Sequence, residues 1–418
     1  MAALAIPSPK AYADGLSLAP LIDEAIHNSP SVLAADARAR AAGHKVSQSS
    51  TPPDPMLTAG YQDEQSGGNN WGKSPDTQVM IGAAQMFPFP GKLGFKEDMT
   101  RAEADAASAA ADEARVRASE RVKSLYIDIY SAERGLEAVS SLEDLFRRVE
   151  DASLARYSSG AGMQSEPLMA QKEKYMLKER EAMLRERADS ARAMLVQALG
   201  RGSSTREVVG APSEPPMVGL LDDPDLYIAG HLARSPMIRE REAMLRAAEA
   251  KVRMARRDYY PDLTLEARYS IRGEPMNNMW RLMGTVNLPV YYGSKLNPAV
   301  DEAQASVEGA RADLEDTRQM LASTMRESLV MARSADTLMS LYKDSLIPRA
   351  RQGFDSAIEA YSSGRGSASE TINALRGVAE SELQYWEQYA ARQKAAIRLE
   401  ATAGISGAEP EQHAEEGK

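Results

Sequence analysis

The chain has 418 residues, a formal net charge of −10 and no cysteine. Aromatic residues make up only 6% and the mean hydropathy is −0.43, while alanine, arginine, glutamate and leucine dominate, a composition that favours long helices or coiled coils. The lack of cysteine excludes disulfides, thiolate metal sites and a cysteine nucleophile. The acidic balance and the absence of basic blocks argue against nucleic-acid binding. No apolar run approaches the ~20 residues of a membrane-spanning helix.

The first 13 residues predict the remnant of a signal peptide. They end in Ala11-Tyr12-Ala13, the small-x-small pattern of a signal-peptidase site. The apolar part is short and lacks a basic start, so an alanine-rich stretch that arose by chance is the alternative. The pattern favours export to the periplasm.

Residues 14–200 predict a first structural repeat. Two proline-bounded, glycine-separated segments read as a β-hairpin, and the long stretch after it contains no proline. One continuous helix there would be ~100 Å long, too long for an ordinary globular domain. The predicted elements are a helix over 20–49, strands over 56–63 and 77–87, and helices over 92–157 and 165–199.

Residues 224–403 predict a second repeat after a linker over 201–223. Its elements are a helix over 224–257, strands over 262–272 and 279–290, and helices over 294–361 and 369–403. Within the first of these last two helices, Pro348 is expected to interrupt the helix. The tail over 404–418 is rich in glycine and glutamate and is predicted to be disordered.

The two halves match each other directly in sequence. Arg40-Ala41-Ala42 aligns with Arg246-Ala247-Ala248 at a shift of 206 residues. The segment 157–162 aligns with 361–366 at a shift of 204, with Tyr-Ser-Ser-Gly-x-Gly in both. A period of about 200 residues is too long for a solenoid repeat, so it indicates two pseudo-symmetric halves of one object.

The strands of the second repeat alternate between apolar and polar positions. This period of two predicts one apolar and one polar face, and about 10 residues is the span of a tilted transmembrane strand. The alternative is an amphipathic sheet on a soluble core. Open edges are not tolerated in lipid, so the membrane interpretation requires several copies, and three would give twelve strands. The residues expected to face lipid are Leu263, Leu265, Tyr269, Ile271, Trp280, Leu282 and Val286.

This duplicated arrangement resembles the TolC-like outer-membrane efflux proteins over roughly residues 15–405. The resemblance rests on the two repeats, on the matching turns at 157–162 and 361–366, and on three motifs at the strand ends. These are Pro53-Asp54-Pro55-Met56-Leu57, Tyr259-Tyr260-Pro261-Asp262-Leu263 and Gln85-Met86-Phe87-Pro88-Phe89-Pro90-Gly91-Lys92.

The resemblance implies a mainly α fold with a small β part and a homotrimer. Long helical hairpins and four transmembrane strands per chain would form a twelve-stranded β-barrel continued by an α-helical barrel. The barrel would lie in the outer membrane of a Gram-negative bacterium, in contact with its lipid, and the helices in the periplasm. A periplasmic adaptor and an inner-membrane pump, most simply of the RND type, would supply substrate for passive conduction.

The two helical turns carry the predicted gate. Glu166 and Glu370 each follow a turn glycine by six residues, and a trimer would place six carboxylates at one aperture, where they would favour cations. Alternatively, each glutamate only complements a helix macrodipole. Arg156, Arg365 and Asn373 are further aperture candidates. The predicted adaptor-docking residues are Tyr157, Ser158, Ser159, Gly160, Gly162, Tyr361, Ser362, Ser363, Gly364 and Gly366.

Other chemistry is sparse in the sequence. There are 21 methionines, and Met276, Met279 and Met283 cluster at the second hairpin. Thioethers bind Cu(I) and Ag(I), although methionine also fills irregular apolar space. The motif at 87–92 resembles members that accompany heavy-metal pumps. No catalytic, cofactor or histidine metal motif is present, so an enzyme is not predicted. A soluble coiled-coil scaffold or adaptor and a type I protein-secretion duct remain the alternatives.

Overall fold

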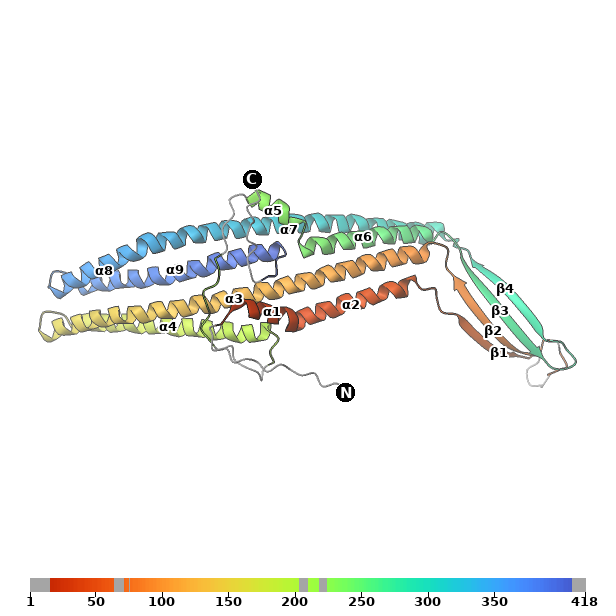
Figure 1. Cartoon of the computed structure of the whole chain (residues 1–418), viewed down its shortest axis with the longest axis horizontal. Helices are drawn as coiled ribbons and strands as arrows, with labels where there is room; N and C mark the ends of the chain where they lie inside the picture. Colours follow the sequence, from red (N-terminus) through yellow and green to blue (C-terminus); the bar gives the residue numbers. More distant parts are fainter. Residues whose placement is uncertain (1–15, 64–70, 75, 203–209, 218–223, 408–418) are drawn as a thin grey trace. The chain divides into compact units, whose positions relative to one another are not determined.

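The computed structural model describes residues 16–63, 71–74, 76–202, 210–217 and 224–407 (Figure 1). The predicted leader at 1–13 lies outside the described residues, as do parts of the predicted linker and tail. The prediction of a mainly α chain with a small β part is confirmed.

The described elements are long helices and four strands. The helices are α1 (Leu18–Asn28), α2 (Pro30–Ser50), α3 (Lys92–Ser158), α4 (Ser165–Ala198), α5 (Pro224–Leu232), α6 (Pro236–Arg257), α7 (Asn297–Leu341), α8 (Ile347–Ser362) and α9 (Ala368–Thr402), with π-helical turns η1 (Tyr292–Leu296) and η2 (Tyr342–Leu346). The strands are β1 (Met56–Gln62), β2 (Gln78–Phe87), β3 (Asp262–Arg272) and β4 (Met279–Asn287).

Proline positions explain where the helices divide. Pro30 and Pro236 each begin a helix, and the residue before a proline is driven out of the α region; Ser29 has an extended ψ of 127°. The stretches 20–49 and 224–257 therefore each contain two helices, where one was predicted. Pro348 was expected to interrupt a helix, and the α-helical ladder does break just before it, between α7 and α8. At this break η2 shifts the hydrogen-bonding ladder by one residue, and Pro348 lies in the first turn of α8, where it needs no N–H partner.

The four strands form one antiparallel sheet in the order β1-β2-β3-β4. The central pair, β2 with β3, joins the two halves of the sequence, and Gln78 through Phe87 pair with Arg272 through Leu263. At the end of β2, the backbone N–H of Phe89 and the ammonium of Lys92 both bind the carboxylate of Asp262, with Oδ1 at 2.8 Å and 2.9 Å respectively. The carboxylate therefore ties the exit from β2 to the start of β3.

The chain divides into two compact units, and each draws on both halves of the repeat. Unit 1 comprises Met1–Ala34, Asp112–Ser235 and Gln319–Lys418, and unit 2 comprises Ala35–Ala111 and Pro236–Arg318. The duplication thus does not produce two separate domains.

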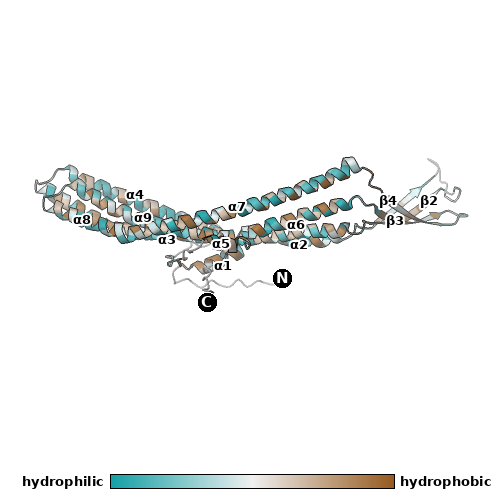
Figure 2. Ribbon diagram, turned by 90° about the horizontal axis from the view of Figure 1, so that it is seen from above, coloured by the Kyte–Doolittle hydropathy of each residue, from teal (hydrophilic) through white to brown (hydrophobic). Residues whose placement is uncertain are grey.

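Unit 1 is a helical bundle whose largest core joins four helices. Phe146 of α3, Leu177 of α4, Phe354 of α8 and Leu375 of α9 are all buried in one cluster. Figure 2 shows the corresponding alternation of hydrophobic and hydrophilic strips along these helices. This core holds the two helical hairpins, α3–α4 and α8–α9, against each other.

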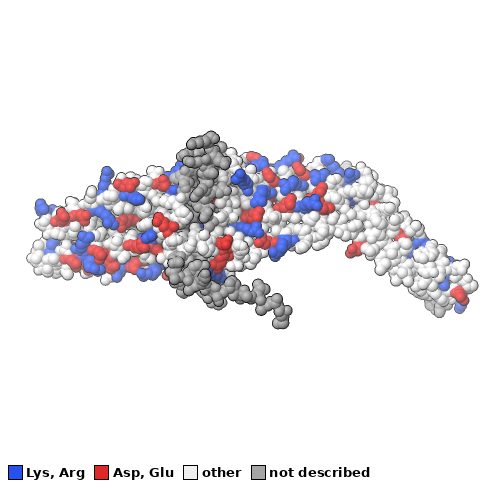
Figure 3. Space-filling view, in the orientation of Figure 1, with Lys and Arg blue, Asp and Glu red and all other residues white. Residues whose placement is uncertain are grey.

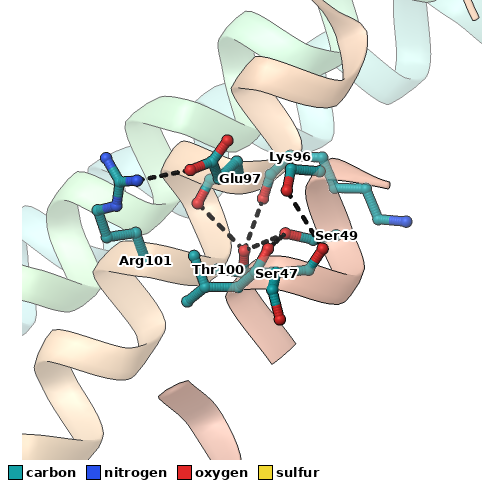
Figure 4. Close-up of polar contacts among 8 residues, drawn as sticks. Ser47, Ser49, Lys96, Glu97, Thr100 and Arg101 are labelled. Atoms are coloured by element: carbon teal, nitrogen blue, oxygen red, sulfur yellow. Dashed lines mark hydrogen bonds and ion pairs between the residues drawn. The ribbon is translucent and has the colours of Figure 1, made fainter. Parts of the chain in front are cut away.

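Unit 2 contains the sheet and the helices that lead to it. Between α2 and α3 the contact is polar: the hydroxyls of Ser49 and Thr100 are buried and 2.6 Å apart (Figure 4). Thr100 also lies within hydrogen-bonding distance of the carbonyls of Lys96 and Glu97. Small hydroxyl side chains with satisfied hydrogen bonds allow two helices to approach closely without a buried unpaired group.

Candidate functional site

The two hairpin turns of unit 1 have the same backbone conformation. Gly160 and Gly364 adopt φ of +75° and +76°, the left-handed region that glycine enters without strain. After Gly160, the N–H groups of residues 161 and 162 bind the carbonyl of Arg156 at 2.9 and 3.0 Å; after Gly364, those of 365 and 366 bind the carbonyl of Ala360 at 2.8 and 2.9 Å. The sequence match at 157–162 and 361–366 therefore encodes one turn used twice.

The side chains of these turns are not equivalent. Tyr157 is 44% exposed, whereas Tyr361, at the same position of the second turn, is fully buried. The phenol of Tyr361 donates to Oε2 of Glu166 at 2.7 Å. The ring of Tyr361 therefore supports the turn from within, unlike the exposed members of the predicted adaptor-docking set.

Arg156 joins the two turns from the other side. Its Nη1 donates to the carbonyl of Tyr361 at 3.0 Å and its Nη2 to that of Ala161 at 3.1 Å. The guanidinium carbon lies 4.9 Å from the centre of the Tyr361 ring, a cation–π distance. The second turn has Ala360 at the position of Arg156, so this bridge is made once per chain. We refer to Arg156, Glu166 and Tyr361 as the tip cluster.

Burial raises the pKa of Tyr361 to about 12, and the hydrogen bond to Glu166 and its negative charge act in the same direction. The phenol is therefore protonated and able to donate across the physiological range. Because the folded-state pKa lies above the ordinary value of 10, the stabilisation is complete below pH 10 and is lost as the pH rises through about 12.

The two predicted gate glutamates differ in their surroundings. Glu166 is half-buried in the tip cluster, and a Cβ on Gly162 would lie 2.7 Å from its Oε2. Glu370 is exposed in the first turn of α9, where Ser367 Oγ accepts from its backbone N–H at 3.2 Å. Arg365 and Asn373 are exposed as well, and Arg365 Nε donates to Ser363 Oγ. The structure thus brings Glu166 together with Arg156 and leaves the other three candidates at the surface.

An ion pair that the sequence analysis missed lies farther along α4 and α9, away from the two turns. Glu173 of α4 is 6% exposed and binds Arg376 of α9 at 2.5 Å. The sequence shows only an acidic residue on one predicted helix and a basic residue on another, and it does not indicate that these two helices pack together. The pair adds a second polar connection between the two hairpins.

The sheet places its leucine, isoleucine, valine and aromatic side chains on one face. Leu263 lies opposite Val286 and Tyr269 opposite Trp280, with the two rings 4.8 Å apart. Leu282 pairs with Ala267 on that same face. All seven residues predicted to face lipid therefore share one face of the sheet.

The apolar face of the sheet is exposed, and in the central strands β2 and β3 the polar face is the more buried of the two. On the apolar face Ile81 is 54% exposed and Leu282 81%, whereas Gln78 and Ser270 on the polar face are 6% and 3% exposed. The sheet, at the right of Figure 3, is mostly free of charge in that view, whereas both signs of charge are interspersed over the helices. A large exposed apolar surface marks contact with a membrane or another apolar partner.

None of the helices among the described residues has an apolar stretch long enough to cross a membrane. Over the same residues, no three histidine, cysteine, aspartate or glutamate side chains are grouped as metal ligands.

Paired long helices, two matching tips and a sheet with an outward apolar face are typical of proteins that combine a membrane sheet with helices outside the membrane. The chain belongs to the outer membrane efflux protein family, whose model matches residues 21–201 and 228–405. Among curated proteins, no sequence matches the chain.

Solved structures share the fold at low sequence identity. The outer-membrane channel OprN is 16% identical with a TM-score of 0.81, over 94% of this chain and 90% of that one. CusC is 18% identical with a TM-score of 0.80, over 92% and 91%. The outer membrane protein VceC of Vibrio cholerae is 20% identical with a TM-score of 0.78, over 93% and 96%.

Proposed function

We propose that this chain is the outer-membrane duct of a tripartite efflux system and that it acts as a homotrimer. The carrying observation is the exposed apolar face of the sheet, which would be costly in water and favourable in lipid. In this arrangement the apolar face contacts outer-membrane lipid and the polar face lines the passage.

The number of strands supports three copies. One sheet has four strands, so β1 and β4 are edges whose backbone groups need partners in hydrocarbon. Three sheets joined edge to edge supply twelve strands and leave no edge, within the range of bacterial outer-membrane barrels. The helices would continue the passage into the periplasm of a Gram-negative bacterium.

The exposed parts of the two turns are the proposed docking surface for a periplasmic adaptor, itself served by an inner-membrane pump of the RND type. Tyr157, Ser158 and Ser159 of the first turn and Ser362 and Ser363 of the second are exposed. Serine hydroxyls and exposed backbone offer hydrogen bonds without a charge requirement. Glu370 and Glu166 would set the charge of the aperture.

The proposed substrates are heavy-metal ions. The motif at Phe87–Lys92, with its two Phe-Pro steps, favours this class, as does the abundance of methionine. The chain's own role is passive, with the energy supplied by the pump.

Oligomeric state in detergent tests the duct directly. We expect the protein to be extracted from membranes only with detergent and to give a homotrimer by native mass spectrometry, which heating converts to monomer. A monomer that stays in solution without detergent would contradict the proposal.

A further inference from the structure

The methionines of the sheet all lie on its polar face. The five are Met56 of β1, Met80 and Met86 of β2, and Met279 and Met283 of β4. The strand register places each of them beside the polar residues of β3. Met86 pairs with Thr264, Met283 with Glu266, and both Met80 and Met279 with Ser270. Met56 pairs with Ala84, which in turn pairs with Glu266. The opposite face holds leucine, isoleucine, valine and aromatic residues.

This distribution is the reverse of what packing or lipid contact requires. An apolar, unbranched side chain would serve on the apolar face, yet every strand methionine lies among threonine, glutamine, serine and charged residues. What methionine offers on a polar face is its thioether sulfur, a soft ligand for monovalent copper and silver. The chain has no cysteine, so thioethers are its only sulfur ligands.

Met80 and Met279 are the best-placed pair. They flank Ser270 on the two adjacent strands, and Ser270 is only 3% exposed between them. Their Cα atoms are about 10 Å apart, two strand spacings, and each flexible side chain can lean toward the other across the small serine. In this structure the methyl group of Met80 lies on the β1 side, 3.8 Å from the position that a Cβ on Gly60 would take, so a shared ion requires Met80 to change rotamer toward β3.

Both sulfurs already face cationic donors. Arg272 Nη2 lies 3.1 Å from Met279 Sδ, and Arg268 Nη1 lies 3.8 Å from Met80 Sδ. A soft cation would take the place of these N–H groups at the sulfur lone pairs. Glu266 accepts from Arg268 Nε at 2.9 Å and so offsets one of the two positive charges.

We propose that the polar face of the sheet is a transit surface for Cu(I) or Ag(I), with Met80 and Met279 above Ser270 as its principal two-thioether site. Met56, Met86 and Met283 provide further single thioethers along the same face. The inference rests on the proposed function, because it requires that this face line a passage. Conduction needs sites that bind and release, and the arginines on this face keep the affinity for a monovalent cation low.

Silver titration of the full chain in detergent tests the site. With methionine methyl groups labelled with carbon-13, we expect Ag(I) to shift the Met80 and Met279 signals first and saturably, while Zn(II) leaves them unchanged. The variant M80L/M279L should bind silver at least tenfold more weakly at this step. The control variant M169L/M176L, which alters two exposed methionines of α4, should titrate like the parent.

Two results would overturn the site: silver shifting all methionine methyl signals together, or M80L/M279L titrating like the parent. Failure of the silver site can be distinguished from failure of the proposed duct function. A detergent-dependent trimer without the silver site would remove only this inference. A monomer soluble without detergent would remove the passage that the transit role requires, even if silver bound at Met80 and Met279.

Discussion

At the scale of single residues, duplication has produced two positions with different roles. Tyr157 and Tyr361 are equivalent in sequence, but only Tyr361 is buried and hydrogen-bonded to Glu166. The difference arises because Arg156 bridges to the second turn and Ala360 cannot bridge back. The tip cluster therefore gives each chain one asymmetric link between its two turns.

The tyrosine link can be tested by removing one oxygen. Tyr361→Phe loses a hydrogen bond to a charged acceptor, a contribution of about 1.5–3 kcal/mol. We expect the population in which the two turns of a chain are separated to rise about tenfold or more. This change would appear as a higher open probability in single-channel recordings. Tyr157→Phe is the matched control and should behave like the parent. Equal recordings for both variants would show that the buried hydroxyl does not hold the tips.

The two glutamates should contribute unequally to ion selectivity. Glu370 is exposed, whereas the Glu166 carboxylate already accepts a hydrogen bond. We expect Glu370→Gln to lower the cation-to-anion permeability ratio more than Glu166→Gln does, and the double variant to lower it furthest. Glu186→Gln, farther along α4, is the control. Unchanged selectivity in the double variant would refute the carboxylate ring.

At the scale of elements, a buried ion pair joins α3 to α9. Lys123 Nζ and Glu400 Oε2 are 2.7 Å apart, with side chains 7% and 10% exposed. Each charge in such a pair depends on the other, because a lone buried charge is not compensated by water.

Breaking this pair should therefore destabilise unit 1. We expect Lys123→Met to cost about 3–5 kcal/mol and Lys123→Met with Glu400→Met to recover most of the loss, measured by thermal unfolding in detergent. Arg185→Met, which removes an exposed pair with Glu181, should cost less than about 1 kcal/mol. Similar losses for Lys123→Met and Arg185→Met would show that burial does not decide the effect.

The elements differed in how far the sequence predicted them. Alternation identified the strands of the second repeat and their faces, proline and glycine bounds identified the first hairpin, and the proline-free stretch identified α3, because these patterns are local. The divisions at Pro30 and Pro236 were missed, although the repeated Ser-Pro steps mark them. The tip cluster was missed because it depends on which turn packs over the other, and packing between hairpins leaves no local pattern.

At the scale of the whole molecule, the function depends on which environment each face of the sheet meets. The duplication supplies β1 and β2 from one half and β3 and β4 from the other, and pairing of β2 with β3 makes a single sheet. One face is apolar and exposed, and the other carries the arginines, the hydroxyls and all five strand methionines. Lipid on the first face and a passage on the second account for both compositions.

Contact between Trp280 and lipid tests this account most directly. The chain has three tryptophans, and Trp280 is 76% exposed on the apolar face. In liposomes of brominated lipid, a variant that keeps only Trp280 (W71F/W386F) should lose most of its fluorescence. A variant that keeps only Trp386 of α9 (W71F/W280F) should retain its fluorescence. Unquenched Trp280, or equal quenching of both, would contradict the placement of the apolar face in lipid.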